Sequence, residues 1–496
     1  MRRVISCFLI TCSLFGLVAC GFGTGSLQND PAANMPQRVL EVGYGKACIT
    51  PTEDGVILRG GASVGKLDDI YAITVAFRDE EGKLYIHVVT DLSWGGMTDK
   101  NPSLGACDMA RNAISYELGI SPEFVTVGGI HNHSQVDASS TQEINARWRN
   151  NVLLPQIVAS VQEAIDDLSP AEMYIGRAKT SKLNFVRRYW LNDGTFYDGF
   201  TSLRDGDVVA HESDPDEEIQ MVRFTRAGKK DILMVNWQCH ATKVSSNGNQ
   251  VCADFVGPLR DKVEEELGVQ CVFYQGAAGN LAPSSRLAGE AIIPDSGWKN
   301  AQKLGWAVAA YVIDAVESDS FEKVETGLIQ HKQIMVGGTV KKYTEVGDEL
   351  YKNAQRVVEY SKTARDNYET AEYAAQFGIE TIHHAKVILQ NATLGMYLNY
   401  ELNIISIGDV AFTTLPMEFF DTTGMQIKEG SPFKMTILLG YSCSRGRYMA
   451  DIDAIPHGGY ETYNTFFVDG TAEETVGYYL KILRDIYPVR KGEGSD

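Results

Sequence analysis

Apolar residues along this chain fall into short runs that alternate with longer amphipathic stretches. The short runs hold four to seven residues, are rich in Val, Ile, Phe and Tyr, and are typical of buried β-strands. They occupy residues 71–77, 84–90, 124–130, 232–237, 271–274, 402–408, 410–416 and 435–440. Apolar positions with helical spacing lie between them, at residues 150–168, 255–268, 299–317 and 473–486. This alternation predicts an α/β fold with mixed β-sheets flanked by helices.

A segment with a different pattern begins at Leu350. Its apolar positions are mostly small residues at helical spacing, and Gly378 is a suitable C-terminal cap. We expect a long solvated helix or helical hairpin that lies over the sheet, within a helical insertion at about 340–378. Because no internal repeat and no Pro-rich linker follow residue 37, residues 37–496 are expected to form a single large domain.

The first 36 residues have the features of an export signal. Arg2 and Arg3 precede an apolar run that is too short for a comfortable transmembrane helix. The run ends in "LVAC", Leu17 to Cys20, which resembles the lipobox at which bacterial lipoproteins are cleaved and lipidated. We expect a lipoprotein signal peptide at 1–19 and a flexible tether at 20–36 with a lipidated Cys20, so that the protein is exported and lipid-anchored to a bacterial membrane of the cell envelope. A plain secretory signal is the alternative.

The charge of the chain excludes nucleic acid as a partner. Its formal net charge is −19, and removal of residues 1–19 takes away two arginines and no acid, which gives −19 − 2 = −21. Such a surface repels phosphate backbones and anionic headgroups, so membrane contact is expected through the lipid on Cys20. The six cysteines beyond Cys20 form no C-x-x-C motif, which excludes a zinc ribbon, while export permits disulfides.

Residues that can bind a metal follow several of the expected strands. His131, His240, Glu418 and Tyr448 each lie past the carboxyl end of one. In open α/β sheets that edge binds ligands, and imidazole and carboxylate ligands with an open coordination position suit a hydrolytic zinc ion. His133 lies two residues after His131, so both side chains point to the same side of an extended stretch. An H-x-H pair alone also fits a surface turn.

Three further features have two interpretations each. The glycines of "QGAAGN", residues 275–280, either bring backbone N–H groups near an anion or form a tight strand-to-helix turn. Arg187 and Arg188 either clamp a carboxylate or an oxyanion, or they are solvated surface charges. The aromatic residues of 189–190 and 196–200 either line an apolar pocket or pack in the core.

Taken in chain order, these stretches resemble the motifs of neutral ceramidases, zinc amidases that cut N-acylsphingosines. The resemblance runs from about residue 40 to the end of the chain, and several ordered motifs together are more specific than any one of them. The segments are "GGIHNHSQVD" (129–138), "NFVRRY" (184–189), "NWQCHATKVSS" (236–246), "CADFVG" (252–257), "FYQGAAGNLAP" (273–283), "TTLPMEFF" (413–420) and "GRYMADIDAIPHGGYE" (446–461).

The resemblance implies one zinc ion, Zn2+, per chain and a single catalytic domain of the neutral ceramidase type. It gives His133 the role of a proton shuttle, and it places Arg187 and Tyr460 where they stabilise the tetrahedral oxyanion. The implied metal ligands are His131, His240, Glu418 and Tyr448, and the implied catalytic residues are His133, Arg187 and Tyr460.

The chain departs from the family pattern in three places. The family has G-D-x-S-P where this chain reads "GNLAP", so Ala282 replaces the serine and Asn280 the acid. The turn after His133 lacks the family's Gly-Pro, and the chain stops after "YYLKILRDIYP" without the C-terminal immunoglobulin-like domain of the true ceramidases. Because a serine nucleophile is missing at position 282, metal-activated water is the expected attacking group.

These observations lead to three functional hypotheses. The first is a lipid-anchored zinc-dependent amide hydrolase that resembles neutral ceramidase and releases a fatty acid and a sphingoid base. The second keeps the zinc site and changes the substrate to another amide or ester, such as an acylated sugar or a cell-wall fragment. The third is a non-catalytic binding lipoprotein.

Overall fold

The computed structural model describes residues 39–93, 106–198, 207–244, 248–318, 320–443 and 446–487. Residues 39–496 form one compact unit. The expected signal peptide, Cys20 and the tether lie outside the described residues. None of the helices described combines the length and the apolar character that crossing a membrane requires.

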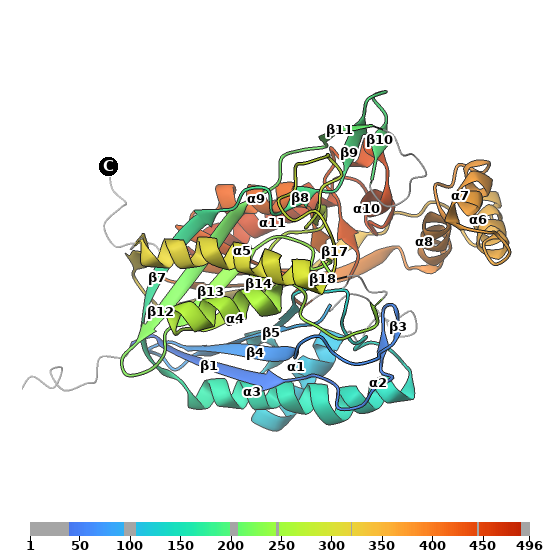
Figure 1. Ribbon diagram of the computed structural model, residues 1–496. Coiled ribbons are helices and arrows are strands. Elements are labelled where there is room, and N and C mark those ends of the chain that lie inside the picture. Colours follow the sequence, from blue (N-terminus) through green and yellow to red (C-terminus); the bar gives the residue numbers. More distant parts are fainter. Residues whose placement is uncertain are drawn as a thin grey trace, which may run out of the picture. The chain divides into compact units, whose positions relative to one another are not determined.

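Two mixed β-sheets form the centre of the molecule (Figure 1). The larger has nine strands in the order β14-β13-β12-β7-β1-β4-β5-β6, with β16 paired to β7. The smaller has the order β17-β18-β19-β21. Within these two sheets, three pairs of strands are parallel, namely β5 with β6, β13 with β14, and β19 with β21. The strands are β1 (Glu41–Cys48), β4 (Tyr71–Arg78), β5 (Leu84–Thr90), β6 (Val125–Gly129), β7 (Ser169–Lys179), β12 (Glu218–Arg226), β13 (Ile232–Trp237), β14 (Gln270–Gln275), β16 (Glu322–Val324), β17 (Ile329–Thr339), β18 (Tyr397–Ile407), β19 (Val410–Leu415) and β21 (Met435–Gly440).

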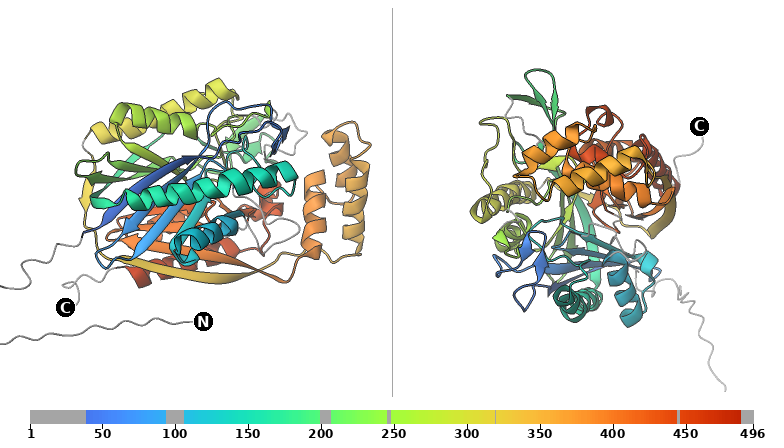
Figure 2. Two further views of the ribbon diagram at one scale, coloured as in Figure 1. Left: turned by 90° about the horizontal axis from the view of Figure 1, so that it is seen from below. Right: turned by 90° about the vertical axis from the view of Figure 1, so that its right-hand side faces the viewer.

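The sheets pack face to face, and helices cover their outer faces (Figures 1 and 2). Strand β4 is almost entirely apolar because both of its faces are buried. Thr74 hydrogen-bonds to Ser160 of an outer helix at 2.8 Å, whereas the ring of Phe77 lies 5.9 Å from that of Phe412 in the second sheet. Helices α1 (Ala106–Leu118), α3 (Leu154–Asp166), α4 (Val256–Leu267) and α5 (Trp298–Glu317) cover the larger sheet, and α9 (Asp421–Gly430) and α11 (Thr471–Ile486) cover the smaller one.

Short elements surround the strand ends. Four small sheets consist of β2 with β3, β8 with β15, β9 with β10 and β11, and β20 with β22. Their bounds are β2 (Ile57–Leu58), β3 (Gly61–Ala62), β8 (Phe185–Val186), β9 (Tyr189–Leu191), β10 (Phe196–Tyr197), β11 (Val208–His211), β15 (Leu281–Ala282), β20 (Glu418–Phe419) and β22 (Tyr448–Met449), and the short helical turns are η2 (Pro122–Phe124), α2 (Glu143–Trp148), η3 (Arg149–Leu153), η5 (Ile455–His457) and α10 (Tyr460–Tyr463).

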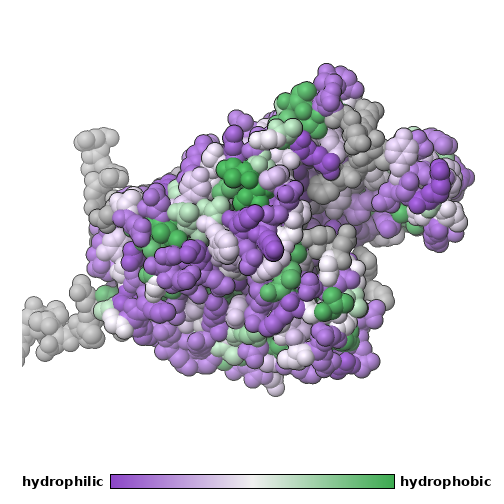
Figure 3. All heavy atoms as spheres, viewed as in Figure 1, coloured by the Kyte–Doolittle hydropathy of each residue, from purple (hydrophilic) through white to green (hydrophobic). Residues whose placement is uncertain are grey.

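The predicted fold class is confirmed: mixed sheets flanked by helices form one domain. All eight expected strands are present, and the segments at 232–237 and 435–440 match β13 and β21 residue for residue. The six cysteines within the described residues are free thiols. The face of the molecule in Figure 3 is largely hydrophilic with scattered apolar residues, as expected for a chain with a net charge of −19.

The helical insertion differs from the expectation. It is longer than about 340–378 and consists of three helices rather than one or two, α6 (Glu349–Tyr360), α7 (Asn367–Ala375) and α8 (Ile382–Thr393). These helices do not lie over the sheet; they extend beyond the end of the β17–β18 hairpin (Figures 1 and 2). The reason is that the three helices bury their small residues against one another, in a core of Ala354, Val357, Ala374, Ile379, Ala385 and Ile388.

Curling of the larger sheet brings two distant strand ends together. Strands β6 and β13 lie near opposite ends of the strand order. The side-chain amide of Gln275, at the end of β14, donates to Ile130 O at 3.1 Å and to Cys239 O at 2.7 Å, and its oxygen accepts from Cys239 N at 2.9 Å. These partners immediately precede His131 and His240, so one buried amide ties the two histidine-bearing segments together.

Candidate metal centre and active-site cavity

Three predicted ligands converge at the strand ends. His131 follows β6, His240 follows β13, and Glu418 follows β19. The Oε2 atom of Glu418 lies 3.4 Å from Nε2 of His131 and 3.3 Å from Nε2 of His240. Ligand atoms bound at about 2.0–2.2 Å around a tetrahedral zinc ion lie about 3.3–3.6 Å apart. The spacing of these three side chains therefore fits zinc.

The chemistry of the facing atoms also fits a cation. Nδ1 of His240 lies 2.6 Å from Ala278 O, which has no proton to give, so Nδ1 carries the ring proton and Nε2 presents a lone pair. Nε2 of His240 and Oε2 of Glu418 are both buried, and neither has a hydrogen-bond partner among the described residues. Burial, reinforced by Arg187, lowers the pKa of His240 to about 3. Two acceptors thus face each other, an arrangement that a divalent cation stabilises.

The position of His131 is fixed from several sides. Its backbone has φ of +59°, which is uncommon for a residue other than glycine. Its Nδ1 lies 2.9 Å from Ser93 Oγ. Its ring stacks on that of Tyr441, with centroids 3.9 Å apart and planes 9° apart. These contacts leave Nε2 directed toward Glu418, as expected for a metal ligand held by neighbouring residues.

The glycine turn at 275–280 supports Glu418. A Cβ atom at Gly279 would lie 2.5 Å from Glu418 O and 2.8 Å from Phe419 O. The Gly279 N–H donates to Phe419 O at 2.7 Å. The absence of a side chain therefore lets this turn pack directly on the backbone of a predicted ligand. Of the two interpretations, the tight turn agrees with the structure, but it leads from β14 into the short strand β15 and not into a helix.

Tyr448 and Arg187 form a buried pair next to Glu418. Strand β20 pairs with β22 in parallel, with Glu418 opposite Tyr448. Arg187 donates to the Tyr448 hydroxyl at 2.9 Å, to Gly279 O at 2.8 Å and to Glu461 at 2.8 Å. Burial and the carboxylate of Glu418 raise the pKa of Tyr448 well above its usual value. The structure therefore brings Tyr448 beside the candidate ligands, while its role as a fourth ligand stays a prediction.

The two adjacent arginines are not surface charges. Arg187 is 5% exposed and Arg188 is fully buried. Arg188 forms ion pairs with Glu212 at 2.6 Å and with Glu461 at 3.2 Å. Arg188 therefore holds Glu461, which in turn orients Arg187.

His133 joins the cluster with a different environment. Ligand nitrogens of His131, His133 and His240 all lie within 4.8 Å of one another. Both ring nitrogens of His133 face Nη1 of Arg59, at 3.0 and 3.1 Å. Burial and the charge of Arg59 lower the pKa of His133 well below its usual value. A guanidinium so close disfavours a second positive charge on this ring, whether it is a proton or a metal ion. The role of His133 as a proton shuttle therefore stays a prediction.

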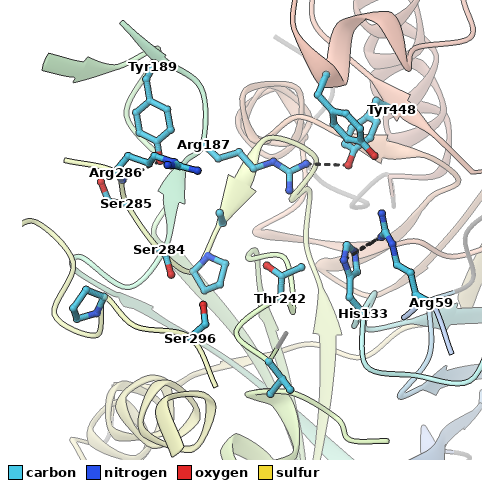
Figure 4. Close-up of a pocket in the computed structure, with 15 residues that line it drawn as sticks. Arg59, His133, Arg187, Tyr189, Thr242, Ser284, Ser285, Arg286, Ser296 and Tyr448 are labelled. Atoms are coloured by element: carbon cyan, nitrogen blue, oxygen red, sulfur yellow. Dashed lines mark hydrogen bonds between the residues drawn. The ribbon is translucent and has the colours of Figure 1, made fainter. Parts of the chain in front are cut away.

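A cavity of about 820 Å³ opens beside these residues. Figure 4 shows Tyr448, Arg187 and His133 at its wall, with Arg59 next to His133. Tyr460, at the start of α10, also lines it, and its ring lies 5.6 Å from that of Tyr448. Ala282, at the place of the family's serine, lines the cavity as well. The predicted catalytic residues thus share one cavity, although their roles stay predictions.

Sequence reasoning missed three residues of this site, namely Tyr441, Gln275 and Arg59. Tyr441 directly follows β21 and Gln275 ends β14, so the strand-end argument that found His131 and His240 also applies to them. Arg59 lies just beyond the two-residue strand β2, for which the sequence has no comparable signal.

Comparison with known proteins supports the architecture. No protein-family profile and no curated protein sequence match the chain. A ceramidase complexed with C2 matches with a TM-score of 0.66 and 16% sequence identity, over 93% of this chain and 77% of that one. The neutral ceramidase from Pseudomonas aeruginosa matches with a TM-score of 0.65 and 15% identity, over the same shares. The chain therefore has the fold of the neutral ceramidase structures.

Proposed function

We propose that this protein is a zinc-dependent hydrolase that cleaves an N-acyl amide, the type of bond that neutral ceramidases cut in N-acylsphingosine. One observation carries the proposal. The lone pair of His240 Nε2 faces Glu418 Oε2 at 3.3 Å, neither atom has a hydrogen-bond partner among the described residues, and Nε2 of His131 lies 3.4 Å from the same carboxylate oxygen. The large cavity beside these three residues is lined by His133, Arg187 and Tyr448. Two imidazoles and a carboxylate form a common catalytic zinc site.

The metal and the surrounding residues have separate tasks. A bound zinc ion would act as a Lewis acid and make water a nucleophile at neutral pH. His133, held neutral by its surroundings, accepts a proton from the attacking water and gives it to the departing nitrogen. Arg187 and Tyr460 donate hydrogen bonds to the oxyanion that forms as the carbonyl is attacked, and such donors typically contribute ~3 kcal/mol each. The C–N bond breaks, and an amine and a carboxylate result.

Water as the attacking group agrees with the hydroxyl groups near the cavity. Position 282 is an alanine. The Oγ atom of Ser284 accepts a hydrogen bond from Lys243 at 2.9 Å, and the same ammonium also donates to two carbonyl oxygens. A lysine with three acceptors is held as a cation and does not act as a base on Ser284. Lys243 therefore does not make Ser284 an activated serine.

Tyr448 is the proposed fourth ligand. Its position opposite Glu418 in the β20–β22 pair supports this role. Removal of its hydroxyl in Tyr448→Phe should weaken zinc binding and also remove an acceptor of Arg187. If Tyr448→Phe binds zinc as tightly as the wild type, Tyr448 is not a ligand.

A second substrate class is supported by the cavity wall. Thr242, Ser284, Ser285 and Ser296 line it, which is polar for a site that would hold a lipid with two long chains. The same zinc centre would then act on a different amide or an ester, such as an acylated sugar or a cell-wall fragment.

We also propose that the protein is an exported lipoprotein anchored through Cys20, on the basis of the "LVAC" sequence. Cys20→Ser should abolish incorporation of labelled fatty acid and release the protein from the membrane fraction. Unchanged labelling of Cys20→Ser would contradict the proposal.

Metal analysis with a substrate panel tests the function. We expect about one zinc per chain, hydrolysis of at least one N-acyl amide at about 1 s⁻¹ or faster, and loss of both in Glu418→Gln. Zinc-loaded protein that binds these amides but leaves every amide and ester intact would favour the non-catalytic lipoprotein instead.

A further inference from the structure

We propose that the cavity selects N-acyl substrates whose amine part carries an anionic group, a carboxylate or a phosphate, which binds at the wall formed by Ser284 and Arg286. This inference deepens the proposed function and rests on it only for the position of the amide that is cut. Ser284, Ser285 and Arg286 directly follow the "GNLAP" segment in which this chain departs from the ceramidase motif.

The cavity differs in charge from the rest of the chain. The chain has 64 acidic and 45 basic residues. Of the 15 residues that line the cavity within the described ranges, three are arginines and none is an aspartate or a glutamate. Guanidinium groups in a recess of an otherwise acidic protein attract anions and retain them by charge-assisted hydrogen bonds. An uncharged lipid gains nothing from this arrangement.

The three arginines have different positions. Arg187 is buried in its ion pair with Glu461 and belongs to the reaction centre. Arg59 lies against His133. Arg286 lies on the other side of the cavity, next to Ser285, with Ser284 and Ser296 farther along the same side, as Figure 4 shows. Its guanidinium carbon lies 5.5 Å from the ring centre of Tyr197. Arg286 therefore defines a charged wall separate from the metal centre.

Lys243 prepares this wall for an anion. It is completely buried, and its ammonium donates to Pro283 O at 3.0 Å, to Ser284 Oγ at 2.9 Å and to Ile293 O at 2.5 Å. These bonds use all three of its protons. Because Ser284 Oγ is an acceptor toward Lys243, its own proton is directed elsewhere, and a negative group in the cavity is a suitable acceptor.

The two groups of residues set the orientation of the substrate. The amide lies at His133, Arg187 and Tyr448, and the anionic group of the amine part lies at Ser284 and Arg286. Hydrolysis consumes one water and releases a fatty carboxylate and an acidic amine, such as an amino acid or an aminoalkyl phosphate.

Two matched substrate pairs test the inference with the full-length zinc-loaded protein. The pairs are N-dodecanoylglycine against N-dodecanoylglycinamide, and N-dodecanoyl-aminoethyl phosphate against N-dodecanoylethanolamine. We expect kcat/KM to be about 10-fold or more higher for the acidic member of at least one pair, and the pair with the larger ratio identifies carboxylate or phosphate as the group recognised. Arg286→Gln and Ser284→Ala should each lower that ratio, Arg286→Gln by about 10-fold.

Arg356→Gln is the matched control, because this arginine is exposed on α6 and does not line the cavity. In Arg356→Gln, the ratio of kcat/KM between the acidic and the neutral substrate should equal that of the wild type. Thermal unfolding verifies that all three variants are folded. Equal kcat/KM within both pairs, or a preference that survives Arg286→Gln, overturns the inference.

Calorimetric binding of the same four compounds separates this inference from the proposed function. If zinc-loaded protein hydrolyses none of the four compounds, the hydrolase proposal is weakened. The ratio of the affinities for the acidic and the neutral member of each pair then decides whether the wall binds an anion. An acidic member that binds about 10-fold more tightly, with loss of that preference in Arg286→Gln, supports the charged wall. Equal affinities, or no binding of either acidic compound, overturn it.

Discussion

The ring of Tyr441 stacks on the ring of His131 with centroids 3.9 Å apart, while the buried Tyr441 hydroxyl has no hydrogen-bond partner in the part of the chain that the structure describes. The ring therefore positions the ligand and the hydroxyl does not contribute. Tyr441→Ala should weaken zinc binding about 10-fold to 100-fold, the usual effect of losing a contact that orients a ligand. Tyr441→Phe should retain wild-type affinity, because it keeps the ring and removes only an unsatisfied group. Competition with a chromogenic chelator measures both, and equal losses in both variants would refute the positioning role.

The close approach of Gly279 to Glu418 gives a second prediction. Gly279→Ala forces a Cβ against the backbone oxygens of Glu418 and Phe419 and should cost about 1–3 kcal/mol of the free energy of unfolding. Because Glu418 moves with its backbone, zinc affinity should fall as well. Gly477→Ala is the control, since this helical glycine of α11 has open space around it and should gain about 0.5–1 kcal/mol. Denaturant unfolding and chelator competition give the two quantities. Wild-type zinc affinity in Gly279→Ala would contradict the coupling.

The amide of Gln275 predicts a coupling between stability and metal binding. Gln275→Leu leaves Ile130 O, Cys239 O and Cys239 N without their partner and should destabilise the fold by about 2–3 kcal/mol. It should also weaken zinc binding, because the segments before His131 and His240 are no longer tied. Gln162→Leu on the exposed face of α3 is the control and should change neither quantity. A Gln275→Leu protein that loses stability but keeps its zinc affinity would show that the tie is only structural.

The adjacent carboxyl groups of Asp68 and Asp69 should change the free energy of unfolding in opposite directions as the pH rises. Burial raises the pKa of Asp68 to about 7 in the folded protein. The protonated carboxyl group therefore contributes fully to stability below its pKa in the unfolded chain, near 4, and this contribution is lost as the pH rises to 7. The Asp68→Asn variant should therefore gain about 2 kcal/mol relative to the wild type between pH 5 and pH 7. A hydrogen bond from Lys66 lowers the pKa of Asp69, so Asp69→Asn should lose stability near neutral pH and recover it in acid. Urea unfolding from about pH 2 to pH 8 measures both trends, that of Asp68 above pH 5 and that of Asp69 below about pH 4. A flat Asp68→Asn difference would show that this carboxyl is ionised in the folded protein.

The sequence predicts the buried strands of this fold better than the half-exposed ones. Strands β13 and β21 are buried at every position, and their uninterrupted apolar runs identify them. Strand β7 is largely exposed along one side and includes Pro170, and β17 carries His331, Lys332 and a glycine pair, so neither shows a clean run. The insertion was underestimated for a related reason: its helices bury alanines against one another, and such faces have a weak apolar pattern.

The candidate ligands follow from local rules, whereas their convergence does not. His131 and His240 each follow a buried strand, which a single sequence reveals. That β6 and β13 meet depends on the curl of a nine-stranded sheet, which has no signature in the sequence. It also depends on the hydrogen bonds of Gln275, whose place at a strand end does not indicate its partners. Tyr441 adopts a φ of +53° directly after β21, and no pattern in the sequence indicates that its ring would reach His131.

Anomalous diffraction at the zinc edge from crystals of the full-length protein, with metal content measured on the same preparation, tests the central claim most directly. We predict one anomalous peak per chain, within about 2.0–2.2 Å of His131 Nε2, His240 Nε2 and Glu418 Oε2. The peak should disappear in Glu418→Gln. A fully occupied peak elsewhere, or none at these three atoms after zinc is supplied, would contradict the account.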